Sequence, residues 1–216
     1  KEQKYLEKYN LYTFKGNSLK RSYLENLDII ELLESYISVP ESEKQLKVLD
    51  IGSKNWFYAT AQNHFFRYNK EEKEVFLTGI ELDAFRVYIS MHSRYDSAMY
   101  NIKNLENTTY IAGDFLEHDG KYNYICCFFP FVIKEPLLHW GLPLNHFKPH
   151  KLFEHAYENL EKNGEILIIN QGYEEYLAQQ KILNELNISF EAKGEFKGTF
   201  LKYEHERYVI LVKKAA

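Results

Sequence analysis

The stretch Lys47–Asn55, which reads K-V-L-D-I-G-S-K-N, decides the fold of this chain. Its residues Val48, Leu49 and Ile51 form a short apolar run, typical of a strand that is buried on both faces of a parallel sheet. Gly52 follows the run directly, and glycine commonly marks the point where a strand turns. The stretch therefore predicts a buried strand that ends at Gly52.

The residues after this strand change to a helical period. We expect a helix to begin near Asn55, because apolar side chains recur at helical spacing at Trp56, Ala59, Ala61, Phe65 and Phe66. Asn55 can also supply, in part, the left-handed conformation of the turn. The first turn of a helix leaves backbone N–H groups unpaired, and these can bind an anionic or carboxylate-bearing ligand. Strand, glycine turn and helix together predict a ligand-binding loop.

Acidic residues close three successive predicted strands. Asp50 lies in the first strand, Glu81 follows Val75–Ile80, and Asp114 follows Thr108–Gly113. Parallel α/β sheets bind ligands at the carboxyl ends of their strands, and an acid there can accept hydrogen bonds from ribose hydroxyls. Two alternatives stay open: Asp50 can be tied to its own loop, and Asp114 can be an ordinary turn residue.

The remaining pattern alternates helices and strands. Asp83 is expected to cap a long helix that extends to Asn107, with His92 and Arg94 on its solvated side. Further strands are predicted at Tyr122–Phe129, Ile166–Ile169, Ile188–Lys193 and Arg207–Lys213. Residues 1–45 are expected to form an N-terminal helical segment packed on the core, and residues 46–216 the main α/β domain.

Composition limits the classes of protein that the chain can belong to. A 45% hydrophobic fraction and interleaved charges argue against disorder, and the formal net charge of -4 gives no general attraction to nucleic acid. No apolar run has the length of a membrane span. Adjacent Cys126 and Cys127 suit buried thiols in a reducing compartment, so we expect a cytoplasmic protein with no membrane partner and no metal site.

The three acidic motifs V-L-D-I-G, G-I-E-L-D and G-D-F resemble those of the class I S-adenosylmethionine-dependent methyltransferases. The chain continues its first motif as G-S-K-N-W, where that family usually has G-x-G-x-G. The resemblance implies a doubly wound, seven-stranded, mostly parallel sheet with an antiparallel last strand and helices on both faces. It also implies S-adenosylmethionine as cofactor, with the candidate ligands Asp50, Gly52, Asn55, Glu81, Asp114, Phe115 and Phe129.

The substrate is expected after the fourth strand. The resemblance places substrate contacts at Pro130 and Phe131, although Phe128 stands where amino-methylating relatives carry a polar residue. The long connection Val132–Pro149 adds His139 and Trp140. His139 is the candidate for substrate contact or proton removal, and a purely structural or solvent-facing histidine is the alternative.

These observations favour a methyltransferase whose acceptor is a small molecule or a protein rather than nucleic acid. A second hypothesis is a non-catalytic protein of the same fold that acts as an interaction module. A third is a different nucleotide-binding α/β enzyme, although the G-x-G-x-x-G and P-loop patterns of the common nucleotide-binding classes do not occur. The oligomeric state stays open.

Overall fold

The computed structural model describes residues 1–215 and divides the chain into two compact units. The first unit comprises Lys1–Gly113 with Gly198–Lys202, and the second comprises Asp114–Lys197 with Tyr203–Ala216. The elements in chain order are α1 (Glu2–Lys8), α2 (Tyr12–Asn17), α3 (Lys20–Tyr36), β1 (Gln45–Ile51), α4 (Ala59–Tyr68), β2 (Glu74–Glu81), α5 (Arg94–Ile102), β3 (Thr108–Ala112), η1 (Phe115–Glu117), β4 (Tyr122–Phe128), α6 (Lys134–His139), η2 (Leu144–His146), α7 (Pro149–Asn159), β5 (Leu160–Gln171), α8 (Gly172–Glu185), β6 (Phe190–Phe196) and β7 (Arg207–Lys213).

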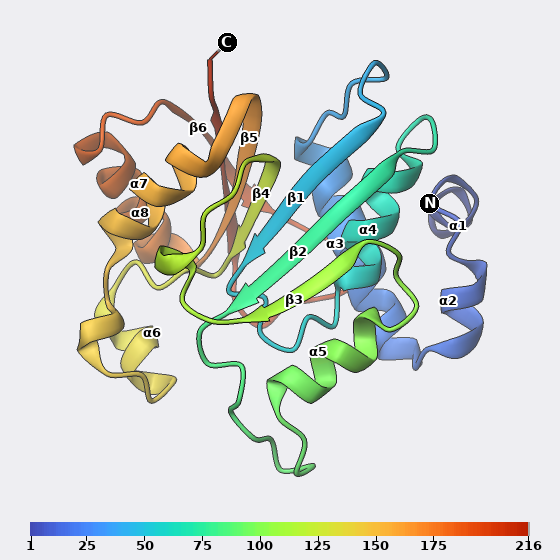
Figure 1. The fold of residues 1–216 in the computed structure, drawn as a ribbon, viewed down its shortest axis with the longest axis horizontal. Coiled ribbons are helices and arrows are strands. Elements are labelled where there is room, and N and C mark those ends of the chain that lie inside the picture. The colour runs from blue at the N-terminus through green and yellow to red at the C-terminus, as the bar shows by residue number, and fades with distance from the viewer. Residues whose placement is uncertain (216) are drawn as a thin grey trace. The chain divides into compact units, whose positions relative to one another are not determined.

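The first unit is built on three parallel strands in the order β3-β2-β1. The register pairs Asp50 with Gly79, so β1 and β2 end at the same edge. Helix α4 packs against β2, and α3 packs against α4 (Figure 1). The large side chains of Trp56, Phe65 and Phe66 are fully buried in this unit. The core of this unit therefore includes one side chain of the loop that follows β1 and two side chains of α4.

The second unit contains β4, β5, β7 and β6 in that order. Strands β4 and β5 are parallel, whereas β7 runs antiparallel to both β5 and β6. Helices α7 and α8 pack against β5 and against each other. The prediction of a seven-stranded, mostly parallel α/β sheet with one antiparallel strand at the end of the chain is confirmed.

Two helix starts differ from the sequence-based expectation. The helix predicted from Asn55 begins at Ala59, because Trp56 has a φ of 44° that a right-handed helix does not accept. The helix predicted from Asp83 begins at Arg94, because Ser93 and Asp96 form a capping box there. The residues between Asp83 and Arg94 form a hairpin-like turn instead, in which the N–H of Arg94 donates to the carbonyl of Arg86 at 3.0 Å.

Among residues 1–215, no helix combines the length and the apolar character that crossing a membrane requires.

Candidate functional site

The loop that follows β1 has an alternating left-handed backbone. Gly52, Lys54 and Trp56 have φ angles of 74°, 58° and 44°. These are the three positions at which the G-x-G-x-G pattern carries glycine. Residues other than glycine rarely adopt such angles, since each costs roughly 1–2 kcal/mol through contact of Cβ with the backbone. The sequence analysis expected Asn55 to supply this conformation, and that expectation was wrong, since its two neighbours do so.

The side chain of Trp56 stabilises the loop by packing in the core of the first unit. Its indole is fully buried, lies against Gly79 of β2 and is 6.1 Å from the ring of Tyr110 on β3. The hydroxyl of Tyr110 donates to the carbonyl oxygen of Lys54. A bulky side chain at this position therefore fills the core of the first unit and leaves the other side of the loop open.

Open space at the loop lies beside Gly52. A Cβ built on Gly52 would meet no other atom within 4 Å, so a ligand can approach the backbone there. The next residue, Ser53, is fully buried, and its hydroxyl has no hydrogen-bond partner among the described residues. A buried polar atom without a protein partner is rare, and a water molecule or a bound group commonly satisfies it.

Asp50 stabilises the same loop from within the strand. Both carboxyl oxygens accept hydrogen bonds, one from the Tyr58 hydroxyl at 2.9 Å and the other from the Gln62 amide. Gln62 in turn accepts from the Trp56 indole N–H at 2.8 Å. Complete burial raises the pKa of Asp50 to about 7, against the opposing effect of its two donors. This chain of contacts connects β1, the loop and α4.

Glu81, at the end of β2, lies at the centre of a second network. Its Oε2 accepts from the Lys54 N–H at 2.9 Å, and its Oε1 accepts from the Asp83 N–H at 2.8 Å and from Arg94 Nη1 at 3.3 Å. A carboxylate has about four acceptor positions, so three donors leave room for about one more. Glu81 can therefore still bind one ligand hydroxyl without losing a protein contact.

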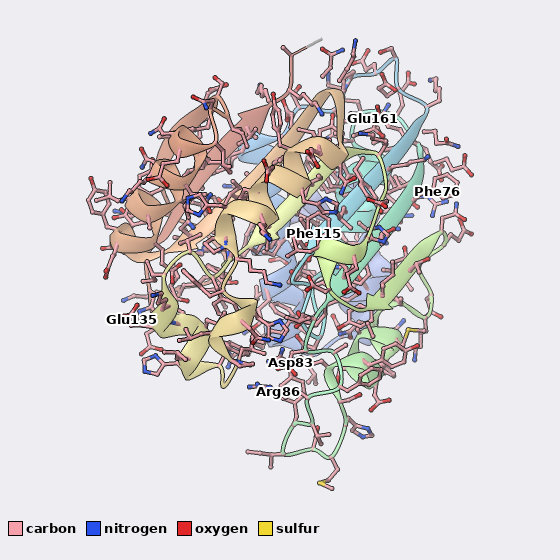
Figure 2. The ribbon with its side chains drawn as sticks, turned by 60° about the vertical axis from the view of Figure 1, so that its left-hand side comes forward. Phe76, Asp83, Arg86, Phe115, Glu135 and Glu161 are labelled. Carbon is pink, nitrogen blue, oxygen red and sulfur yellow. The ribbon has the colours of Figure 1, made fainter. Side chains whose placement is uncertain are left out.

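Arg94 is the main residue of this network that the sequence analysis placed wrongly. It was expected on a solvated helix face, but it is 3% exposed and forms ion pairs with Glu81 and, at 3.4 Å, with Asp83. Asp83 also pairs with Arg86, and Figure 2 shows these two labelled side chains close together. No periodic signal marked Arg94, because its partners belong to other elements: Glu81 ends β2, and Asp83 lies in the turn that the helical pattern concealed. His92 is exposed, as expected.

Within the first unit, the structure thus brings Gly52, Asn55 and Glu81 to one sheet edge, with Asp50 buried beneath the loop. The carbonyl of Asn55 accepts from the Asn101 amide at 2.9 Å, which ties the loop to α5. The sequence analysis missed Ser53, Tyr58 and Gln62. The only signal for Tyr58 and Gln62 was Asp50 itself, because a carboxylate in a buried strand needs hydrogen-bond donors.

The second unit contains the other candidates. Asp114 Oδ1 accepts from the Leu116 N–H at 3.0 Å, and Phe115 is buried with its ring 4.9 Å from that of His155. Asp114 thus caps the turn η1, in agreement with the alternative that the sequence left open for it. Phe115 is labelled in Figure 2.

The residues after β4 differ in exposure. Phe129 has a φ of 59° and is 39% exposed, which is unusual for a large apolar residue in a left-handed conformation. Pro130 is buried and Phe131 half-buried. His139, the last residue of α6, is exposed, and Trp140 at its C-cap is half-buried.

Comparisons with known proteins give the fold. No protein-family model matches the sequence, and neither does any curated protein. Among solved structures, a Listeria monocytogenes protein described as a class I S-adenosylmethionine-dependent methyltransferase is similar at 12% identity, with a TM-score of 0.60. The match covers 95% of this chain and 65% of that protein.

Two further structures have the same architecture. A methyltransferase from Pyrococcus furiosus is 18% identical, with a TM-score of 0.59 over 88% of this chain and 83% of its own. Aeropyrum pernix fibrillarin, solved with natively bound S-adenosyl-L-methionine, is 13% identical, with a TM-score of 0.54 over 85% of this chain and 73% of its own. The chain therefore has the Rossmann-like fold of the class I methyltransferases.

Proposed function

We propose that this protein is an S-adenosylmethionine-dependent methyltransferase. The supporting observation is the backbone of the loop after β1, which is left-handed at Gly52, Lys54 and Trp56 although only the first is glycine. Strained backbone persists only where the surroundings enforce it, and it is concentrated at functional sites. The buried Trp56 side chain and the hydrogen bond from the Tyr110 hydroxyl to the Lys54 carbonyl hold the loop in this conformation.

The residues of the first unit fit the nucleoside and amino-acid parts of this cofactor. Glu81 has acceptor capacity for a ribose hydroxyl, and the open side of Gly52 suits a polar group close to the backbone. Asn55 is half-buried in the same loop and is a further candidate contact for the cofactor. Because Asp50 is fully buried, we assign it the positioning of this loop.

In the second unit, we propose that Asp114 accepts from the adenine amine, and that Phe115 and Phe129 provide apolar contacts. Phe129 is the better supported of the two aromatic residues, because it keeps an exposed ring on a left-handed backbone. Asp114 uses one oxygen to cap η1, and its other oxygen has acceptor capacity.

S-adenosylmethionine supplies an electrophilic methyl group when bound. The protein then needs mainly to hold an acceptor nucleophile in line with that group, with a base where the nucleophile carries a proton. Pro130, Phe131 and Trp140 are the proposed acceptor contacts, and His139 at the end of α6 is the proposed proton acceptor. A small molecule or a protein is the proposed acceptor. The buried thiols of Cys126 and Cys127 support a cytoplasmic location.

Calorimetric titration with S-adenosylmethionine and with its demethylated product tests this proposal before an acceptor is known. We expect the parent protein to bind both compounds, and Glu81→Gln to weaken binding about tenfold or more, as loss of a hydrogen bond to a charged group does. Glu74→Gln is the matched control, because Glu74 is exposed at the opposite end of the same strand. It should bind like the parent.

The absence of binding in a folded parent sample would contradict the proposal. It would favour the second candidate, a non-catalytic protein of this fold.

A further inference from the structure

A cavity of about 490 Å³ lies in the second unit between α7 and α8. Its volume is within the range of small-molecule sites, roughly 300–1,000 Å³. It is lined by Val132, the residues around the start of α7, and one face of α8. None of these residues has a role in the proposed methyl transfer.

The floor of the cavity is apolar. Val132, Pro149 and Ile182 are buried, and Phe147 and Ala178 are half-buried. A ligand that covers these side chains removes apolar surface from water, which favours binding by roughly 25 cal/mol per Å². The floor therefore suits the apolar body of an organic molecule.

The rim of the cavity is positively charged. Lys148 and Lys151 come from the start of α7 and Lys181 from α8, whereas Glu185 is the single acidic lining residue. Glu185 is already engaged, by His150 Nε2 at 2.7 Å and by Lys181 at 3.8 Å. Lys148 and Lys151 form no side-chain hydrogen bond or ion pair with another residue of the described part of the chain. Two lysines therefore remain available to a ligand.

The rim is locally positive, although the whole chain has a formal net charge of -4. The start of α7 adds to this positive charge, because Lys148 at the N-cap provides no side-chain cap and the first-turn N–H groups carry a partial positive charge. Helix α7 has 11 residues, so this contribution is of ordinary size. The apolar floor and the cationic rim together suit a ligand that has an apolar body and a negative charge.

We propose that the cavity between α7 and α8 binds an organic anion with an apolar body, held by Lys148 and Lys151 over Val132 and Ile182. The ligand class is that of medium-sized carboxylates, sulfonates and phosphates. This proposal does not rest on the methyltransferase activity, since it uses no residue of the cofactor site.

A pair of fluorescent probes tests the proposal. 1-Anilinonaphthalene-8-sulfonate has an apolar body with an anionic group, and N-phenyl-1-naphthylamine has the same body without the charge. We expect the parent protein to bind the sulfonate more tightly than the neutral probe. The double variant Lys148→Gln/Lys151→Gln should weaken sulfonate binding roughly tenfold, the effect of losing charge-assisted contacts, and leave the neutral probe unchanged.

Two further variants make the test specific. Lys162→Gln/Lys197→Gln removes the same charge from exposed lysines of the same unit that do not line the cavity, and should bind both probes like the parent. Ala178→Trp fills the cavity from α8 and should weaken both probes, with circular dichroism to verify the fold. Equal sulfonate affinity of the two double variants, or an Ala178→Trp protein that binds both probes like the parent, would overturn the proposal.

Discussion

The indole of Trp56 lies so close to the backbone of Gly79 that a Cβ at Gly79 would be 2.7 Å from Cζ3 of Trp56. This contact connects the loop after β1 to the strand that carries Glu81. It explains why β2 contains a glycine in its interior, where glycine is otherwise unfavourable.

We therefore predict that Gly79→Ala is destabilising. Overpacking of a filled core costs about 1–3 kcal/mol, and the indole has no exposed side toward which it can shift. Urea unfolding of the two proteins measures the difference. Gly113→Ala is the control, because its Cβ would meet Ile111 at an ordinary 3.8 Å. If Gly79→Ala and Gly113→Ala have the same free energy of unfolding, the contact is not tight.

Lys54 allows a test of backbone strain in the loop. Its φ of 58° predicts that Lys54→Gly raises the free energy of unfolding by about 1 kcal/mol, because glycine adopts this conformation without a Cβ contact. Lys54→Ala removes the side chain but keeps Cβ, so it should bring no such gain. Equal stability of the two variants would show that the backbone at Lys54 is not strained.

Asp50 predicts a pH dependence of stability. Its pKa rises from 3.8 in the unfolded chain to about 7 in the folded protein, so the folded state binds more protons between these values. Stability should therefore fall as the pH rises from about 4 to about 7, by at most about 4 kcal/mol for a shift of roughly three pKa units. Above about pH 7, the contribution of Asp50 to stability should no longer change with pH.

Urea unfolding at pH 4.5 and pH 7.5 measures this effect, and Asp50→Asn should reduce the difference between the two pH values. Carbon NMR titration of the Asp50 carboxyl gives the pKa itself. A value near 4 would contradict the desolvation argument.

The buried pair of Arg94 and Glu81 predicts a strong coupling. Arg94→Met leaves Glu81 with an uncompensated buried charge, and loss of one partner of such a pair costs about 3–5 kcal/mol. The double variant Arg94→Met/Glu81→Gln should regain much of that loss. A double-mutant cycle by urea unfolding checks this, and additive effects of the two substitutions would contradict it.

The succession of strands along the chain could be predicted from the sequence, because each buried strand is a short apolar run with a turn signal after it. Val48–Ile51 and the run before Glu81 are examples, and both lie where expected. The position of Glu81 at a strand end followed from the same signal. The alternation of strands and helices in a parallel α/β sheet depends on short stretches of sequence, so it can be recognised in a single sequence.

The contacts that shape the site could not be predicted, because they join residues from different elements. Gln62 bonds to Asp50 from α4, and Arg94 reaches Glu81 from the start of α5. The helix starts were misplaced for a related reason. Trp56 fits a helical period by its apolar character, but the core beneath Gly79 holds it in a left-handed loop. Tertiary packing thus overrides the local pattern.

Amide hydrogen exchange with and without the demethylated cofactor tests the central claim most directly, namely that the loop at Gly52–Trp56 binds S-adenosylmethionine. We predict that a saturating concentration slows exchange in a peptide that covers residues 52–58, and leaves a peptide from the opposite end of β2, residues 74–77, unchanged. Unchanged exchange in residues 52–58 at concentrations up to the millimolar range would contradict the account.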